Sequence, residues 1–151
     1  MNRFKKILMA LTFLIVSQLS FAQGSAVLGD EVNEWDIYKD KYGKYLGLKE
    51  VRMKMIKLRT VGPDVELIKV TSPEKAPHLA LIEYKAGSAG TSKIVHVYRA
   101  VIYDLKKQRF VGQAPLRRES ADGKKLEAKW SYENGLLTIK DPREGKLEFK
   151  L

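Results

Sequence analysis

Histidine, cysteine and serine are the side chains that most often carry metal or nucleophilic chemistry, and this sequence offers few candidates. It contains two histidines, His78 and His96, and no cysteine. A zinc site needs three or four ligands, and the expected same-face strand neighbours of His96, Ile94 and Tyr98, cannot ligate a metal. Ser88 stands in Gly-Ser-Ala-Gly, which lacks the G-x-S-x-G spacing of a nucleophile elbow. The sequence therefore predicts no metal, no cofactor and no catalytic residue.

A pair of carboxylates is the other common catalytic arrangement. Glu83 and Asp104 are the acids nearest the most apolar predicted strands. Glycosidic chemistry needs two carboxyl groups across a cleft, one of them with a raised pKa, and the sequence places neither acid opposite a partner. We therefore predict a protein that is not an enzyme. A hydrolase that uses Glu83 or Asp104 with a histidine is kept as the third of three functional hypotheses.

Basic side chains form the pattern that stands out. The chain has 28 Lys and Arg against 18 Asp and Glu, a formal net charge of +10. Acids cluster between residues 23 and 47, so the more basic remainder is expected to attract anions. Two outward-facing groups are predicted to form an anion- or partner-binding surface: Arg52, Lys54, Lys57 and Arg59 along one strand, and Lys129, Lys140 and Lys146 across three. The alternative is that these side chains only protect strand edges and keep the protein soluble.

The lysine row depends on the register of three C-terminal strands. Residues 125–133 alternate between apolar and polar side chains, and Asn134-Gly135 is the typical sequence of a two-residue type I′ hairpin turn. That turn pairs Tyr132 with Leu137 and Trp130 with Ile139. A loop from Asp141 to Gly145 then pairs Ile139 with Leu147 and Leu137 with Phe149. Every one of these pairs falls on one apolar face, which is why a single register is predicted.

The remaining segments predict further short strands after one helix. Apolar residues spaced three and four apart indicate an amphipathic helix over residues 30–42, ended by Gly43. Residues 48–59 alternate as a strand, with a β-bulge at Met55-Ile56. Further strands are expected over residues 65–71, 78–85, 93–105 and 109–111, with loops at 62–64, 72–77 and 86–92. The predicted fold is mainly β: a small antiparallel meander barrel or sandwich of about eight short strands, preceded by one N-terminal helix.

The first residues resemble an export signal. Arg3, Lys5 and Lys6 precede an apolar stretch over residues 7–16, and Ser20-Phe21-Ala22 fits a cleavage site. We predict a cleavable signal peptide over residues 1–22, an acidic helical segment over 23–47 and a basic β-rich domain over 48–151. The mature protein is then periplasmic or secreted, with no transmembrane segment. Short strands with charged outer faces argue against an outer-membrane barrel.

Three functions follow as hypotheses. The first is a non-enzymatic binding protein that engages an anionic cell-envelope component or an acidic protein through its basic strand faces. Nucleic acid is not expected as a partner outside the cytoplasm. The second is a small β-barrel carrier with an apolar ligand inside the barrel, and the third is the periplasmic hydrolase described above. The oligomeric state is left open.

Overall fold

The computed structural model describes residues 31–50, 52 and 54–151, and the predicted signal peptide lies outside them. A 3₁₀ turn, η1 (Val32–Glu34), precedes the strands. The strands are β1 (Trp35–Asp40), β2 (Gly43–Leu48), β3 (Ile56–Lys57), β4 (Glu66–Thr71), β5 (Leu79–Ala89), β6 (Val95–Asp104), β7 (Arg109–Ser120), β8 (Lys125–Glu127), β9 (Lys129–Glu133), β10 (Leu136–Asp141) and β11 (Gly145–Lys150). The described part of the chain is therefore mainly β, as predicted. It contains no helix long and apolar enough to cross a membrane.

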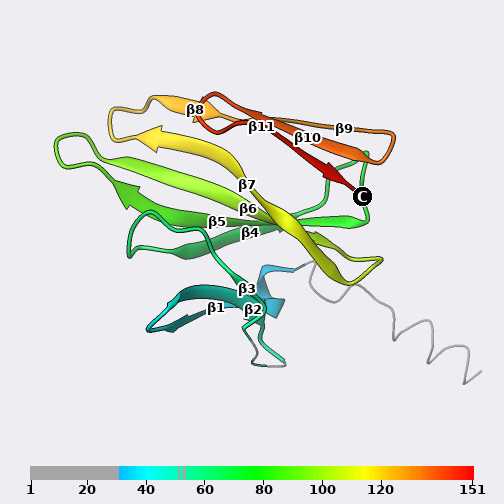
Figure 1. Ribbon diagram of the computed structural model, residues 1–151. Helices are drawn as coiled ribbons and strands as arrows, with labels where there is room; N and C mark the ends of the chain where they lie inside the picture. Colours follow the sequence, from blue (N-terminus) through cyan, green and yellow to red (C-terminus); the bar gives the residue numbers. More distant parts are fainter. Residues whose placement is uncertain (1–30, 51, 53) are drawn as a thin grey trace, which may run out of the picture.

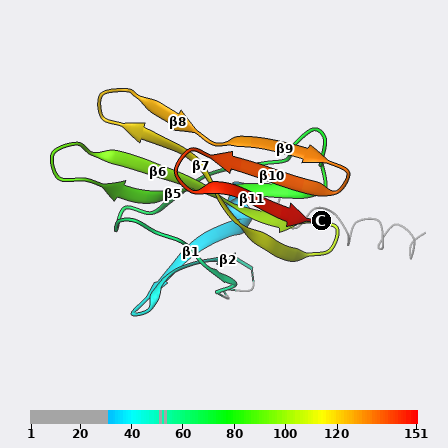
Figure 2. The same ribbon diagram turned by 45° about the horizontal axis from the view of Figure 1, so that its top comes forward.

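The strands form three antiparallel sheets stacked as layers. The central sheet has the order β4-β5-β6-β7-β8, the first sheet β1-β2-β3, and the C-terminal sheet β11-β10-β9. Figures 1 and 2 show the first sheet on one side of the central sheet and the C-terminal sheet on the other. Neither a closed barrel nor an enclosed barrel interior is present among the described residues. The barrel that the carrier hypothesis required is therefore not present in this part of the chain, and eleven strands in three sheets replace the single barrel or sandwich of about eight strands that was predicted.

An apolar core lies between the central sheet and each of the two smaller sheets. On one side, Trp35 and Leu46 of the first sheet pack against Ile82, Tyr84 and Val101 of the central sheet. On the other side, Leu79 and Ile102 pack against the apolar face of the C-terminal sheet. Because successive side chains along a strand point to opposite faces, β5 contributes to both cores. This two-sided burial explains why β5 and β6 are apolar at nearly every position.

The C-terminal sheet follows the predicted register. Tyr132 pairs with Leu137 and Trp130 with Ile139. Ile139 in turn pairs with Leu147, and Leu137 with Phe149. These pairs confirm the prediction. The register could be predicted because a short turn and an apolar face both restrict the pairing to one alignment.

The Asn134-Gly135 turn should be sensitive to substitution. Asn134 has φ of 50° and Gly135 of 75°, and both values lie in the left-handed region. A side chain in that region costs about 1–2 kcal/mol, so Gly135→Ala should lower the free energy of unfolding by about 1 kcal/mol or more. Urea denaturation measures this change, and Asn134→Gly serves as the control because glycine tolerates the same conformation. A denaturation midpoint unchanged by Gly135→Ala would contradict the left-handed turn.

The predicted N-terminal helix is wrong. Residues 35–48 form the β1–β2 hairpin, in which Trp35 pairs with Leu48 and Asp40 with Gly43. The Asp40 carboxylate accepts hydrogen bonds from the backbone N–H groups of Tyr42 and Gly43 at 2.7 and 3.1 Å. Such a bond from an aspartate to its own turn favours a turn over a helix. The predicted boundary between residues 47 and 48 falls inside β2.

The predicted strand over residues 48–59 is mostly wrong as well. Only Ile56 and Lys57 are in β3, and they pair with Leu46 and Tyr45 of β2. Arg52 adopts φ of 47° in a turn, so the chain reverses direction here instead of extending. The proposed bulge at Met55-Ile56 does not occur, because Met55 is outside the strand and donates its N–H to the Leu46 carbonyl. Val51 and Met53 lie outside the described residues.

Two central strands are longer than predicted. β5 continues to Ala89, through the first half of the predicted flexible loop. β7 runs from Arg109 through Pro115 to Ser120, where the sequence suggested a loop at the proline. The ladder between β6 and β7 shifts register next to Pro115, so Leu116 is left without a partner there. A bulge of this kind accommodates a proline that cannot donate to the ladder.

Candidate binding site

The seven predicted binding residues do not form one surface. Lys57 lies in β3 of the first sheet, and Lys54 lies in the segment before β3. Arg52 and Arg59 are nearby in the chain. Lys129, Lys140 and Lys146 belong to the C-terminal sheet, in the opposite layer. The central sheet separates the two groups, as Figure 1 shows. The two groups therefore have to be assessed separately.

The first group is dispersed. Lys54 forms an ion pair with Asp40 at 2.5 Å, and its ammonium lies over the Tyr45 ring at 5.3 Å. Arg52 is in a turn, whereas Arg59 follows β3. The predicted shared outer face rested on one continuous strand, which is not present. The basis on which the sequence placed these four residues on one face is therefore missing.

The second group is brought together as predicted. Lys140 lies opposite Lys129 on one side and opposite Lys146 on the other. All three are exposed, whereas Ile139 and Leu137 of the same sheet point inward and are buried. Directly opposed side chains in an antiparallel sheet have Cβ atoms about 5 Å apart. Lys146 also pairs with Glu148 at 2.5 Å.

Hydroxyl groups lie in the next row of this outer face. Ser131 is opposite Thr138, which is opposite Glu148. We call the outward side of the C-terminal sheet the lysine face, defined by Lys129, Lys140, Lys146, Ser131, Thr138 and Glu148. A shallow hollow of about 320 Å³ lies over part of it; its lining is Ser131, Glu133, Leu136, Thr138, Lys140 and Lys146. The face thus combines ammonium and hydroxyl donors around one hollow.

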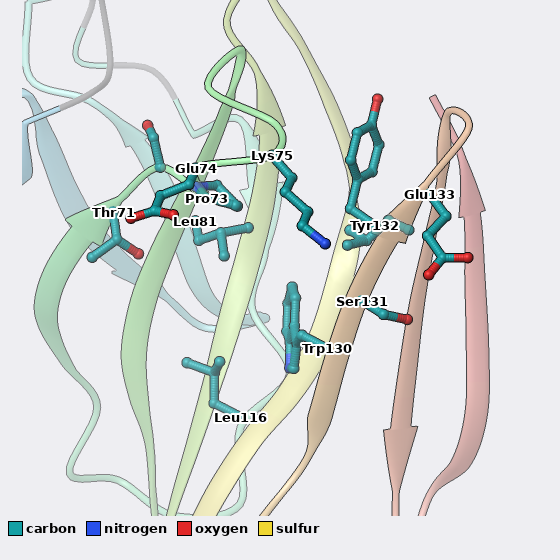
Figure 3. Close-up of a pocket in the computed structure, with 12 residues that line it drawn as sticks. Thr71, Pro73, Glu74, Lys75, Leu81, Leu116, Trp130, Ser131, Tyr132 and Glu133 are labelled. Carbon is teal, nitrogen blue, oxygen red and sulfur yellow. The ribbon is translucent and has the colours of Figure 1, made fainter.

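A larger groove of about 500 Å³ lies at the border of the C-terminal sheet (Figure 3). Its walls are β9 on one side and the loop after β4 on the other, with apolar side chains from β5, β7 and β10 between them. The lining is Thr71, Ser72, Pro73, Glu74, Lys75, Leu81, Leu116, Trp130, Ser131, Tyr132, Glu133 and Leu137. Its volume is within the range of ligand sites.

Two aromatic side chains of β9 give the groove its shape. Trp130 donates its indole N–H to the Pro115 carbonyl at 3.1 Å, which fixes the ring against β7. Tyr132 meets the His78 ring edge to face, with centroids 6.1 Å apart. Figure 3 shows the Lys75 side chain extending from the loop toward these rings. Sequence reasoning identified the two aromatic residues as inward-facing but not the groove, because its second wall is distant in the sequence.

The two candidate catalytic acids are engaged in structural contacts. Glu83 is buried and pairs with the Arg117 guanidinium, which also binds Glu119. Asp104 is buried at the start of a turn and accepts the Lys107 backbone N–H at 2.9 Å. The described residues contain no group of three or more His, Asp and Glu that could hold a metal ion. Glu83 is thus held by arginine, whereas Asp104 and His78 both line a small hollow of about 190 Å³, together with Lys106, Lys107, Tyr132 and Leu151.

A serine, a histidine and an aspartate do meet, but in the wrong order for a nucleophile. Ser88 Oγ lies 2.6 Å from Asp64 Oδ2 and 2.7 Å from His96 Nδ1. Hydrogen bonds from Lys85 and Ser88 hold the pKa of Asp64 well below its usual range, so Asp64 is ionised and accepts a hydrogen bond from the Ser88 hydroxyl. A triad needs the histidine between serine and acid. Here the serine is in the middle, and the cluster joins β5, β6 and the turn before β4.

Two arginines, Arg99 buried and Arg118 partly buried, anchor the tip of the β10–β11 hairpin. Arg99 donates to both carboxylate oxygens of Glu144, at 2.5 and 3.1 Å, and Arg118 reaches Glu144 at 3.2 Å and Asp141 at 3.4 Å. Burial raises the pKa of Asp141, but the N–H groups of Glu144 and Arg143 and the Arg118 charge outweigh it, so the net shift is downward. These contacts fix the lysine face on the central sheet.

No family model, curated protein or solved structure matches this chain. Its function therefore has to be inferred from its own residues.

Proposed function

We propose that this protein is an exported, non-enzymatic binding protein that engages an anionic partner through the lysine face. The observation that supports the proposal is the row of Lys129, Lys140 and Lys146 on three adjacent strands. Like charges directly opposite each other destabilise a sheet. Folding gives no reason to keep such a row, whereas an anion bound across it would remove the repulsion.

The surroundings of the row suit an oxygen-rich anion. Lysine ammonium groups and the hydroxyl groups of Ser131 and Thr138 are all hydrogen-bond donors. Phosphate, sulfate and carboxylate groups accept such bonds, and charge-assisted bonds are the stronger ones. Since the lysines are exposed and lie on three adjacent strands, the face fits a repeated anionic surface better than one small ion. Cell-envelope lipids and acidic glycans present such surfaces.

A charge reversal confined to the lysine face tests the proposal. We expect Lys140→Glu/Lys146→Glu to bind vesicles containing anionic lipid at least thirtyfold more weakly than the unmodified protein, because each lysine near an anionic surface contributes about 1 kcal/mol. Binding of the unmodified protein should also weaken steeply with added salt, since screening shortens the range of exposed charges. Co-sedimentation with vesicles at two salt concentrations measures both effects.

The matched control reverses the same number of charges elsewhere. Lys106→Glu/Lys107→Glu changes two exposed lysines in the β6–β7 turn, away from the lysine face. This variant should retain most of the binding, as should Arg52→Glu/Arg59→Glu in the opposite layer. Equal losses in all three variants would show that net charge alone drives the binding, and the lysine face would then have no special role.

A further inference from the structure

Strand β9 has an unpaired edge. It is the outer strand of the C-terminal sheet and pairs only with β10 among the described residues. The two-residue turn makes Glu133 and Leu136 a hydrogen-bonded pair, and hydrogen-bonded and non-bonded pairs alternate from there. The N–H and C=O groups of Trp130 and Tyr132 therefore point away from β10. No backbone group of the described residues bonds to them.

The side chains along this edge are complementary to themselves. If two copies of β9 pair antiparallel about Ser131, Lys129 of each copy lies opposite Glu133 of the other. Trp130 then lies opposite Tyr132 of the second copy. The backbone agrees with this register, because Trp130 and Tyr132 are the residues whose free groups point outward. We infer that two copies of this protein associate through their β9 edges into one continuous six-stranded sheet.

The other edge of the same sheet carries a different pattern of charges. Strand β11 is also unpaired on one side. In a self-pairing about Glu148, that residue would face its own copy, and Lys146 would face Lys150. Both contacts are between like charges, which disfavours pairing. A pairing about Leu147 would instead place Lys146 opposite Glu148, so on β11 the charges favour or disfavour a copy according to the register.

The 500 Å³ groove provides space for the incoming strand. It lies directly beside β9, between that strand and the loop holding Pro73 and Lys75 (Figure 3). An added strand places alternate side chains on the inner face of the sheet. In this register those side chains are Trp130 and Tyr132 of the second copy, which remain packed on that copy's own central sheet. The dimer would also join two lysine faces into one surface, but its existence does not depend on the proposed function.

Exchanging the two charges tests the inference. Lys129→Glu or Glu133→Lys alone replaces two attractive contacts with two repulsive ones, so each variant should dimerise roughly tenfold more weakly or worse than the unmodified protein. An equimolar mixture of the two variants should recover dimers, because every contact between them is attractive again. The double variant should also recover them. Sedimentation equilibrium over a concentration series measures the masses.

A second pair of variants separates edge pairing from a general effect of charge. Ser131→Lys places two lysines face to face at the centre of the interface and should abolish the dimer. Thr138→Lys adds the same charge to the same face on β10, the middle strand, and should leave the dimer intact. A protein that stays monomeric at every concentration overturns the inference, as does a mixture of charge variants that fails to recover dimers. An apolar dye that occupies the groove without changing the mass of a monomer would assign the groove to a small ligand instead. Vesicle binding by a monomer would leave the proposed function standing.

Discussion

Gly87→Ala should destabilise the protein by roughly 3 kcal/mol or more, the sum of backbone strain and a steric clash. Gly87 has φ of +120°, a conformation that L side chains rarely adopt. An added Cβ would lie 2.5 Å from the Gly62 nitrogen and 2.7 Å from its Cα, so backbone would have to move. The two glycines bring the turn before β4 against the bulge in β5. Urea denaturation followed by circular dichroism measures the loss.

Gly123→Ala is the matched control for this substitution. Gly123 also has a positive φ, +82°, but an added Cβ would meet nothing within 4 Å. Only the cost of the conformation remains, about 1–2 kcal/mol. If both variants lose the same stability, the close approach between Gly87 and Gly62 does not contribute.

Trp35→Ala should cost about 3–5 kcal/mol, the usual range for removing a large buried aromatic side chain. Trp35 is 1% exposed and meets the rings of Tyr103 and Phe110 edge to face, with centroids at 5.3 and 5.9 Å. The substitution removes one of the contacts that hold the first sheet on the central sheet. Thermal or urea unfolding gives the difference in free energy.

Tyr42→Ala is the control for Trp35→Ala, because Tyr42 is 65% exposed in the β1–β2 turn. Its loss should change stability by less than about 0.5 kcal/mol. The sequence placed both aromatic residues on one face of a helix, where both would be core-facing. A similar large loss in both variants would favour the helix over the hairpin.

The parts of the fold that could be predicted are those decided by local signals. The C-terminal sheet is one: Asn134-Gly135 selects a turn, and the alternation around Trp130 and Ile139 allows one register. The lysine row followed from the same register. The hydroxyl row of Ser131 and Thr138 could have been found by extending this register one row further along the strands.

The parts of the fold that were predicted wrongly depend on contacts between residues far apart in the sequence. The stripe of Val32, Trp35, Tyr38 and Tyr42 has helical spacing, but strands also favour aromatic residues. The deciding contact is that of Trp35 with Tyr103, far along the chain. The groove was missed for the same reason, since Pro73 and Trp130 come together only when the layers stack. The division of the basic residues between two layers likewise depended on which face each small sheet covers.

The stacking of three sheets also determines how the stability is distributed over the protein. The two small sheets cover opposite faces of the central sheet and contact it largely through side-chain packing. They share no strand with each other. Either small sheet can open while β5 and β6 keep their ladder, so local opening of one side need not unfold the other. A partner that bends or lifts the C-terminal sheet would act on half of the molecule only. The aromatic cluster of Trp35, Tyr103 and Phe110, on the far side, would be left in place.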